Sequence, residues 1–282
     1  MGKLALRAIK QLFCASGGLV SLGCALCVLW ASTGLARAQD RAAQTGFTLS
    51  ETSAAAWVLR FDAAISPALA QDIDAFADRF ALLEQRPVLI ALLGSSGGDA
   101  YAAMQIGTRL RALDAHVFVT SSCDSACLFV LASGVFRSAP AFSVGIHRAQ
   151  VTRSSGAPMS QDGSAPIPAD TLRDLMGRFE RDAVAYLGRM GVDAGLVALM
   201  QGIDTTHVRR LSEQDLIARG VIGLDAEYRA AQAARLVPLL RDAPTPDEIG
   251  ALIRSIGSHC GLHFGRPAAF ADCHLRRLFV GG

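Results

Sequence analysis

Three short segments carry the side chains and turns with which a protein can attack a carbonyl group. Residues 95–99 form a glycine turn after an apolar run, Ser125 lies between two cysteines, and His147 ends a third apolar segment. A serine hydroxyl becomes a nucleophile when a base removes its proton. A serine at a helix start also places a developing oxyanion near backbone N–H groups and the positive end of the helix dipole. The three segments therefore predict an oxyanion hole, a nucleophile and a base.

Each of these features also has an ordinary structural interpretation. Ser125 suits the N-cap of an apolar helix, His147 suits a hydrogen-bonded core histidine, and the glycine pair suits a tight turn. Any one of them alone favours the structural interpretation. Their joint order along the chain favours a catalytic site.

Charge and lysine content exclude several classes of function. Four basic residues and no acidic residue lie in the first 38 positions, so the net charge of +2 for the chain leaves −2 for the remainder. This balance predicts no basic face for nucleic acid. The only lysines are Lys3 and Lys10. A chain that has lost them has no Schiff-base lysine, no Ser–Lys dyad and no phosphate-loop lysine.

The N-terminus has the pattern of an export signal. Basic residues precede an uncharged stretch at positions 12–35, and small residues around Arg37 suit cleavage before Gln39. The apolar stretch is also long enough for a membrane anchor, which takes about 20 residues. We predict a signal peptide or signal anchor at 1–38 and a linker at 39–55. The protein is then exported, either periplasmic or anchored and facing the periplasm, with membrane contact only through an uncleaved leader.

Four of the seven cysteines lie outside this leader, an even number that suits an oxidising compartment. The simplest disulfide pairing joins Cys123 to Cys127 and Cys260 to Cys273. Four cysteines allow three connectivities. Free buried thiols and a zinc site completed by His259 or His274 remain alternatives.

Strand and helix patterns alternate from residue 56 to about residue 235. Residues 88–93 form a continuous apolar run, which is typical of a strand buried on both faces of a parallel sheet. Ser66 and Pro67 suit a helix start, residues 170–190 suit an amphipathic helix, and residues 126–132 fit a helix or a strand. We predict an α/β domain at 56–235 with a parallel sheet flanked by helices. Residues 236–282 are broken by prolines and are predicted as a small disulfide-tied appendage.

Four blocks in this order resemble the ClpP/crotonase superfamily. Residues 95–99 are similar to its Ser-Pro-Gly-Gly-Ser turn, and residues 125–134 to its Ser-Met-Gly nucleophile helix. Residues 144–148 are similar to its Met-Ile-His-Gln segment, and residues 211–222 to its closing block. The resemblance spans about residues 57–225 and implies a β-β-α superhelix.

The resemblance implies a role for each matching residue. Ser125 corresponds to the nucleophile and His147 to the general base, and the N–H groups of Gly98 and Ala126 correspond to the oxyanion hole. The third member is expected at Asp204, although a gapless alignment places Val208 there. Asp193 and Asp215 are the alternatives, as is a dyad without an acid.

The resemblance implies a serine hydrolase, most simply a ClpP-like peptidase without a cofactor, and the N-terminal pattern predicts that it is exported. Its expected substrate is a peptide or an unfolded protein segment, and no ATPase partner is expected outside the cytoplasm. Homo-oligomers are usual in the superfamily. The main alternative is a non-catalytic binding or assembly protein on the same fold. A crotonase-type enzyme is a third hypothesis, but near Ser125 it has only Asp124 as a carboxylate, and export separates it from coenzyme A.

Overall fold

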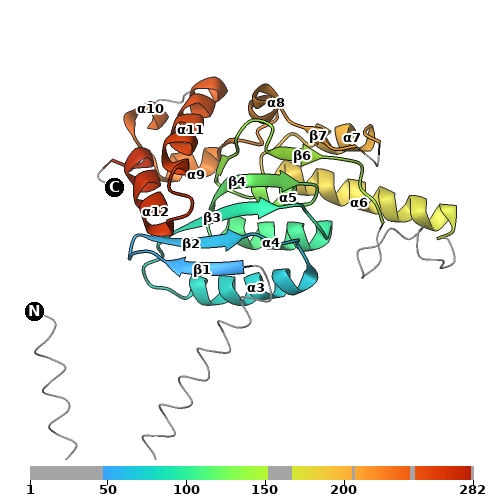
Figure 1. Ribbon diagram of the computed structural model, residues 1–282, viewed down its shortest axis with the longest axis horizontal. Coiled ribbons are helices and arrows are strands. Elements are labelled where there is room, and N and C mark those ends of the chain that lie inside the picture. Colours follow the sequence, from blue (N-terminus) through green and yellow to red (C-terminus); the bar gives the residue numbers. More distant parts are fainter. Residues whose placement is uncertain (1–46, 152–166, 205–206, 242–244, 281–282) are drawn as a thin grey trace, which may run out of the picture. The chain divides into compact units, whose positions relative to one another are not determined.

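The computed structural model describes residues 47–151, 167–204, 207–241 and 245–280. In these residues the chain forms a mixed, mostly parallel sheet with helices packed against it (Figure 1). The predicted α/β class with a parallel sheet is therefore confirmed. The predicted leader lies outside the described residues.

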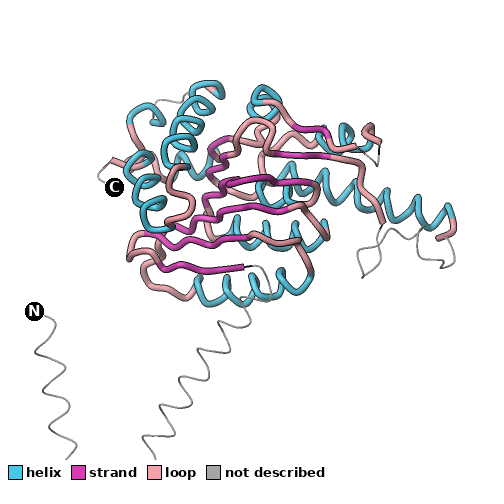
Figure 2. The backbone as a smooth tube through the Cα atoms, in the orientation of Figure 1, coloured by secondary structure: helices cyan, strands magenta, loops and turns pink. Residues whose placement is uncertain are grey.

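The strands form one sheet in the order β1-β2-β3-β4-β5-β8, and β6 pairs with the C-terminal end of β4 and with β7 (Figure 2). The pairs among β2, β3, β4, β5 and β6 are parallel, whereas β1, β7 and β8 each pair antiparallel. The strand bounds are β1 Phe47–Glu51, β2 Ala56–Phe61, β3 Val88–Ser95, β4 His116–Asp124, β5 Phe136–Ser138, β6 Val144–Ile146, β7 Arg209–Arg210 and β8 Gly223–Leu224.

The helices alternate with these strands and continue beyond them to the C-terminus. Ser66 caps α3 by accepting a hydrogen bond from Leu69 N, with Pro67 in the first turn, as the sequence predicted. Ser212 and Asp215 form a capping box at the start of α8. The helix bounds are α3 Pro67–Ala81, α4 Ala100–Ala112, α5 Cys127–Ala132, α6 Ala169–Arg189, α7 Gly195–Gln201, α8 Glu213–Ala218, α9 Ala226–Ala231, α10 Pro238–Arg241, α11 Pro246–Gly261 and α12 Pro267–Leu278.

The central strand β3 divides its side chains between two hydrophobic cores. Leu89, Ala91 and Leu93 pack in the larger core with residues of α3, α4, α5 and α6. Ile90 and Leu92 point the other way and pack with residues of α11 and α12. Because successive side chains of a strand face opposite sides, a continuous apolar run is what a strand covered on both faces requires. The prediction of a doubly buried strand at 88–93 is confirmed.

The C-terminal segment is a layer of this fold rather than a small appendage. Residues 45–282 form one compact unit, and the segment's largest buried side chain, Phe270, packs against Phe118 of β4 with ring centroids 4.9 Å apart. Pro238 and Pro246 are the first residues of α10 and α11, so they start helices and do not end the core. The sequence did not predict this layer because the apolar residues of the segment are divided among three separate helices, α10, α11 and α12.

One local prediction is corrected and one open alternative is resolved. Residues 47–51 belong to the predicted linker but form β1, whose register places Phe47 opposite Phe61 of β2. The ambiguous stretch that begins at Ala126 is the helix α5. Among the described residues, no helix is both long and apolar enough to cross a membrane.

Candidate active site

Three parallel strands bring the predicted site segments to one edge of the sheet. In the ladder Ser95 of β3 lies beside Cys123 of β4, which in turn lies beside Val144 of β6. Each strand ends within a few residues of that row. The glycine turn, Ser125 and His147 therefore follow neighbouring carboxyl ends of strands, where open α/β sheets bind ligands.

Ser125 has a backbone conformation that non-glycine residues rarely adopt. Its φ is +56°, in the left-handed region. The helix α5 takes Ala126 as its N-cap and has no side-chain cap hydrogen bond. The ordinary N-cap interpretation of Ser125 is therefore wrong. The strand-to-helix turn is held at its backbone, where Ser125 N–H donates to the carbonyl of Gly145 over 2.8 Å.

The glycine turn lies directly against the Ser125 turn. Gly97 and Gly98 have φ of +97° and +142°. A Cβ on Gly97 would lie 2.7 Å from the Cβ of Ser125 and 3.2 Å from Ala126 N, and a Cβ on Gly98 would overlap the backbone of Ile65. Both positions therefore require glycine for the backbone angle and for the close approach.

The two backbone N–H groups predicted for the oxyanion hole are not used by the fold. In the described part of the chain, no carbonyl or side chain accepts a hydrogen bond from Gly98 N–H or Ala126 N–H. A backbone N–H that the fold leaves without a partner is available to a ligand. Gly98 and Ala126 also line one pocket with Ser125 and His147.

His147 follows β6 and is held by the next residue of the chain. Its Nδ1 lies 2.8 Å from the carbonyl oxygen of Arg148. Because a carbonyl only accepts, Nδ1 carries the hydrogen and Nε2 carries the lone pair of the neutral ring. This is the tautomer that a serine hydrolase base requires when Nε2 takes the serine proton. Arg148 is fixed in turn by its Nε, which donates to the carbonyl of Gln201 over 2.8 Å.

The pocket that these residues share has a volume of about 350 Å³ and an apolar wall. Helix α6 supplies much of this wall, and its Phe179 packs edge-on against Phe129 of α5 at 6.2 Å. The Tyr186 hydroxyl ties α6 to α5 by donating to the carbonyl of Phe129 over 2.8 Å. The apolar side chains of the wall come from Phe129, Ala149, Val151, Leu175, Met176, Phe179 and Met200.

Polar groups at the pocket are tied to the surrounding helices. Asp99 caps α4 by accepting from Ala102 N over 2.8 Å, so its carboxylate already has a structural partner. Tyr101 of α4 donates to Asp182 of α6 over 3.1 Å. Partial burial and this carboxylate raise the pKa of the Tyr101 phenol, which keeps it neutral at neutral pH.

Asp124, the residue before Ser125, has a bidentate ion pair with Arg210 of β7. Arg210 Nη2 lies 3.1 Å from Asp124 Oδ2, and Arg210 Nη1 contacts Oδ1. The pair crosses Gly145, where a Cβ would clash with the carboxylate. The carboxylate that a crotonase-type reaction would need is therefore already engaged by a guanidinium.

The structure does not bring the predicted third residue to the pocket. Asp204 is exposed in the segment between α7 and β7 and is not among the residues that line the pocket. Of the alternatives, Asp193 pairs with Arg219 at 2.6 Å. Asp215 accepts hydrogen bonds from Ser212 in its capping box, and these lower the pKa of its carboxyl. The group seen to orient His147 is the backbone carbonyl of Arg148.

The cysteines form the simplest of the predicted pairings. Cys123 is bonded to Cys127, and Cys260 to Cys273. The zinc alternative is wrong because these sulfurs are used, and His274 contacts His116 instead, with 2.7 Å between His274 Nε2 and His116 Nδ1. In the described residues no three His, Cys, Asp or Glu side chains gather as metal ligands. Two disulfides are compatible with an exported protein.

Sequence reasoning missed the groups that hold the site. The carbonyl of Arg148 has no sequence signature because every residue carries one. Arg210 pairs with a residue 86 positions earlier, a contact that only the β6–β7 ladder creates. The apolar wall was partly predictable from the sequence, since Leu175 and Phe179 lie in the amphipathic helix predicted at 170–190.

Comparison of the chain with protein-family models and with curated proteins finds no match.

Proposed function

We propose that this chain is an exported serine hydrolase, a ClpP-like peptidase on a ClpP/crotonase-type fold. The observation that carries the proposal is the turn at Ser125. A serine is held at φ +56° without capping its helix, in one pocket with a histidine whose Nε2 has the lone pair. A turn with these properties between a strand and a helix is the usual support of a nucleophilic serine in α/β hydrolases.

The chemistry follows from these groups. Nε2 of His147 takes the proton of Ser125 while Oγ attacks the substrate carbonyl. The N–H groups of Gly98 and Ala126 bind the oxyanion that develops on the carbonyl oxygen, and groups of this kind contribute about 10²–10³-fold in rate each. His147 then protonates the leaving amine, and water hydrolyses the acyl-enzyme by the same path in reverse.

The substrate class rests on the shape and lining of the pocket. An apolar wall beside the proposed nucleophile favours a peptide that presents a large apolar side chain next to the scissile bond. The strand order and the four matching sequence blocks support the ClpP/crotonase fold. A homo-oligomer in the periplasm or at its membrane is part of this proposal.

A fluorophosphonate probe tests the proposal because it labels only activated serines. We expect the exported full chain to be labelled, and labelling to be lost in Ser125→Ala and His147→Ala. Ser133→Ala is the matched control, because this buried hydroxyl donates to the carbonyl of Val130 and lies outside the pocket. It should label at the wild-type rate.

The binding-protein alternative predicts the opposite result. Asp204 lies outside the pocket lining and Val208 stands at the aligned position of the family's acid, and both observations favour a scaffold that has lost catalysis. A folded, oxidised wild-type chain that takes up no probe would support this alternative and contradict the hydrolase.

A further inference from the structure

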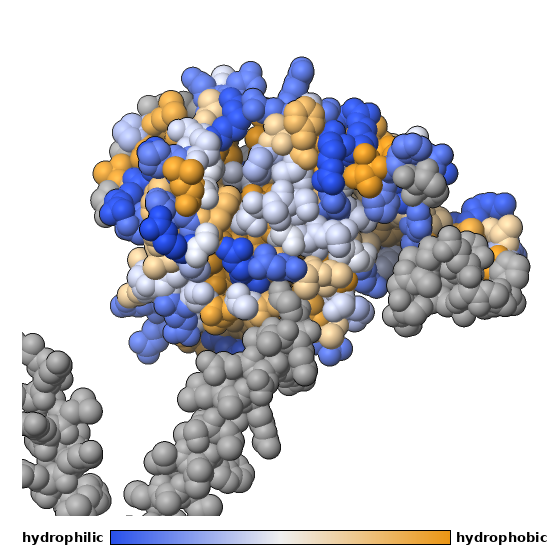
Figure 3. All heavy atoms as spheres, viewed as in Figure 1, coloured by the Kyte–Doolittle hydropathy of each residue, from blue (hydrophilic) through white to orange (hydrophobic). Residues whose placement is uncertain are grey.

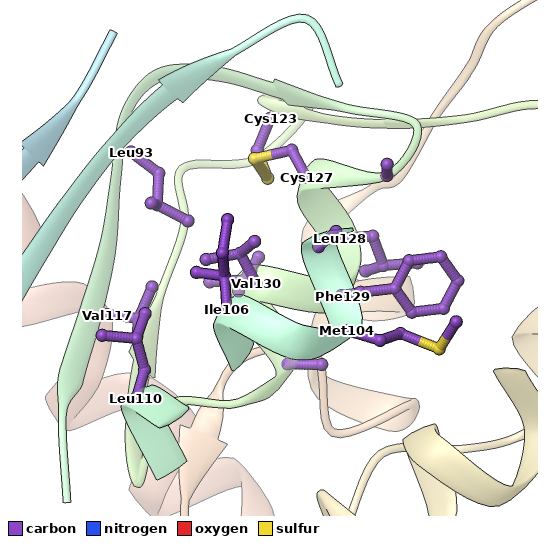
Figure 4. Packing of buried hydrophobic residues seen from close by; sticks show 14 of the residues in the cluster. Leu93, Met104, Ile106, Leu110, Val117, Cys123, Cys127, Leu128, Phe129 and Val130 are labelled. Atoms are coloured by element: carbon purple, nitrogen blue, oxygen red, sulfur yellow. A yellow bond between two sulfur atoms is a disulfide. The ribbon is translucent and has the colours of Figure 1, made fainter. Parts of the chain in front are cut away.

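The Cys123–Cys127 disulfide brackets the proposed nucleophile. Cys123 lies near the end of β4, Cys127 is the first residue of α5, and Ser125 is the middle of the three residues between them. Both cysteines are fully buried. Figure 4 shows the bond at the edge of the larger core, where β4 passes into α5.

Ser125 needs a restraint of this kind because its conformation is unfavourable by itself. A serine at φ +56° has a sparsely populated backbone conformation, which persists only where its surroundings enforce it. Backbone hydrogen bonds hold the strand side, from Cys123 N to Ser143 O and from Ser125 N to Gly145 O, both 2.8 Å. On the helix side, Leu128 N donates to the carbonyl of Ser125 over 3.1 Å. None of these bonds is a covalent limit on where α5 begins relative to β4.

The disulfide supplies that limit. It closes a loop of five residues and so fixes where α5 begins relative to the end of β4. The loop also contains Ala126, whose N–H belongs to the proposed oxyanion hole. On the other side, the Ser125 turn packs against Gly97, where an added Cβ would lie 2.7 Å from the Cβ of Ser125.

We infer that the Cys123–Cys127 disulfide is the positioning element for Ser125, so that the site reacts only in its oxidised form. The inference rests on the proposed function for its reactivity, but its structural part stands alone: without the bond, Ser125 leaves the left-handed region. Cys123 and Cys127 are positioning residues because they act through Ser125 and Ala126 rather than on the substrate.

The chain contains a matched control for this inference. The second disulfide, Cys260–Cys273, joins α11 to α12 in the other core and also involves a fully buried sulfur. Neither of its cysteines lines the pocket at Ser125. Its loss removes a disulfide from the same molecule without touching the serine turn.

The experiment compares fluorophosphonate labelling of the full chain in two double variants, each corrected for its folded fraction by urea titration. Misplacement of a reacting group by about 1 Å can cost on the order of 100-fold, so we expect Cys123→Ala/Cys127→Ala to label about 100-fold more slowly. Cys260→Ala/Cys273→Ala should label within about twofold of wild type, because its change is remote from the reacting groups. Equal labelling of the wild type and the Cys123/Cys127 variant would overturn the inference and leave the hydrolase intact.

Reduction of the Cys260→Ala/Cys273→Ala chain with dithiothreitol gives a second measurement if the site variant does not fold. Dithiothreitol supplies two electrons and two protons to the disulfide, is oxidised to its cyclic disulfide and leaves two thiols. We expect labelling to fall on reduction and to return on reoxidation, and unchanged labelling of the reduced protein would overturn the inference.

A crystal structure of the oxidised and of the reduced protein separates the two proposals. A wild-type protein that is not labelled would contradict the proposed hydrolase function. The φ of Ser125 in the two structures would then test by itself whether the disulfide positions the serine. A φ that stays near +56° after reduction overturns it.

Discussion

Ser125 and His147 each show a feature that the fold itself does not need. The serine has a left-handed backbone although glycine would adopt it more readily. The histidine donates from Nδ1 to its neighbouring carbonyl, which leaves Nε2 directed by the backbone alone. A residue that sits in an unfavourable conformation beside unused N–H groups is the usual mark of a functional turn.

The acid of the predicted triad can be tested at Asp204. We expect Asp204→Asn to change the fluorophosphonate labelling rate by less than about threefold, because the carbonyl of Arg148 already orients His147. In a Ser-His-Asp triad the equivalent change costs on the order of 10⁴-fold. The measurement is the labelling rate at pH 7.5, with Asp193→Asn as a second carboxylate outside the pocket. A drop of 100-fold or more in Asp204→Asn alone would restore Asp204 as the third catalytic residue.

At the scale of elements, β6 and β7 join the serine turn to the histidine. Asp124 precedes Ser125, Arg210 lies in β7, and His147 follows β6, which pairs with β7. The Asp124–Arg210 pair therefore connects the two proposed catalytic segments. The pair also has an electrostatic effect, because the guanidinium neutralises the carboxylate of the residue that precedes Ser125.

Removal of this guanidinium should weaken the site more than the fold. Arg210 is partly exposed, and partly exposed ion pairs contribute only about 0–1 kcal/mol to stability. We expect Arg210→Met to lower the labelling rate by about fivefold to tenfold, corresponding to roughly 1 kcal/mol of coupling. The unfolding free energy should change by less than about 1 kcal/mol.

A double-mutant cycle with Asp124→Asn checks the electrostatic cause. If the unpaired carboxylate slows the reaction, Asp124→Asn in the Arg210→Met background should recover part of the lost rate. Arg219→Met is the matched control, since Arg219 pairs with Asp193 at 2.6 Å and is outside the pocket at Ser125. Strictly additive effects of the two substitutions would contradict the electrostatic interpretation.

The sequence predicts elements well where the pattern is long and local. The apolar run of β3 and the cap of α3 depend on neighbouring residues, and both predictions are confirmed. The strand β5 went unrecognised because Phe136–Ser138 is three residues long and one of them is the buried Arg137. Short strands are defined by their partners in the sheet, which a local pattern does not reveal.

The site follows the same division. Order along the chain predicted that the glycine turn, Ser125 and His147 share the pocket, because carboxyl ends of parallel strands meet at one edge. The predicted Asp204 is not among the residues that line it. The order did not predict what orients the site residues, since a carbonyl at Arg148 and a long-range pair at Arg210 depend on the final geometry. The C-terminal layer was not predicted for the same reason, because its apolar residues form a core only by packing against the second face of the sheet.

In the whole molecule, one buried polar cluster links the sheet to this C-terminal layer. His116 of β4 contacts Tyr228 of α9 through Nε2 at 2.8 Å and His274 of α12 through Nδ1 at 2.7 Å. Phe118, Phe136 and Phe270 surround the two histidines.

The face of the molecule seen in Figure 3 carries both hydrophilic and hydrophobic residues.

Burial makes this cluster sensitive to acid. Both histidines are fully buried, and desolvation lowers the pKa of His116 to about 3 and that of His274 well below its usual range. Below pH 6.5 the unfolded chain binds protons at these histidines while the folded chain does not. The free energy of unfolding therefore falls as the pH falls from 6.5 towards 3, and the stabilisation is fully present above 6.5.

Urea unfolding at pH 7.5 and pH 5.5 measures this effect. We expect a loss of about 1.4 kcal/mol per buried histidine at pH 5.5, one pH unit below the unfolded pKa. His274→Phe should remove about half of the pH dependence, because one of the two titrating groups is gone. His259→Gln changes an exposed histidine and should leave the dependence as in the wild type. A wild-type protein equally stable at both pH values would mean that these histidines titrate in the folded state, and therefore that water reaches the interface between the sheet and its C-terminal layer.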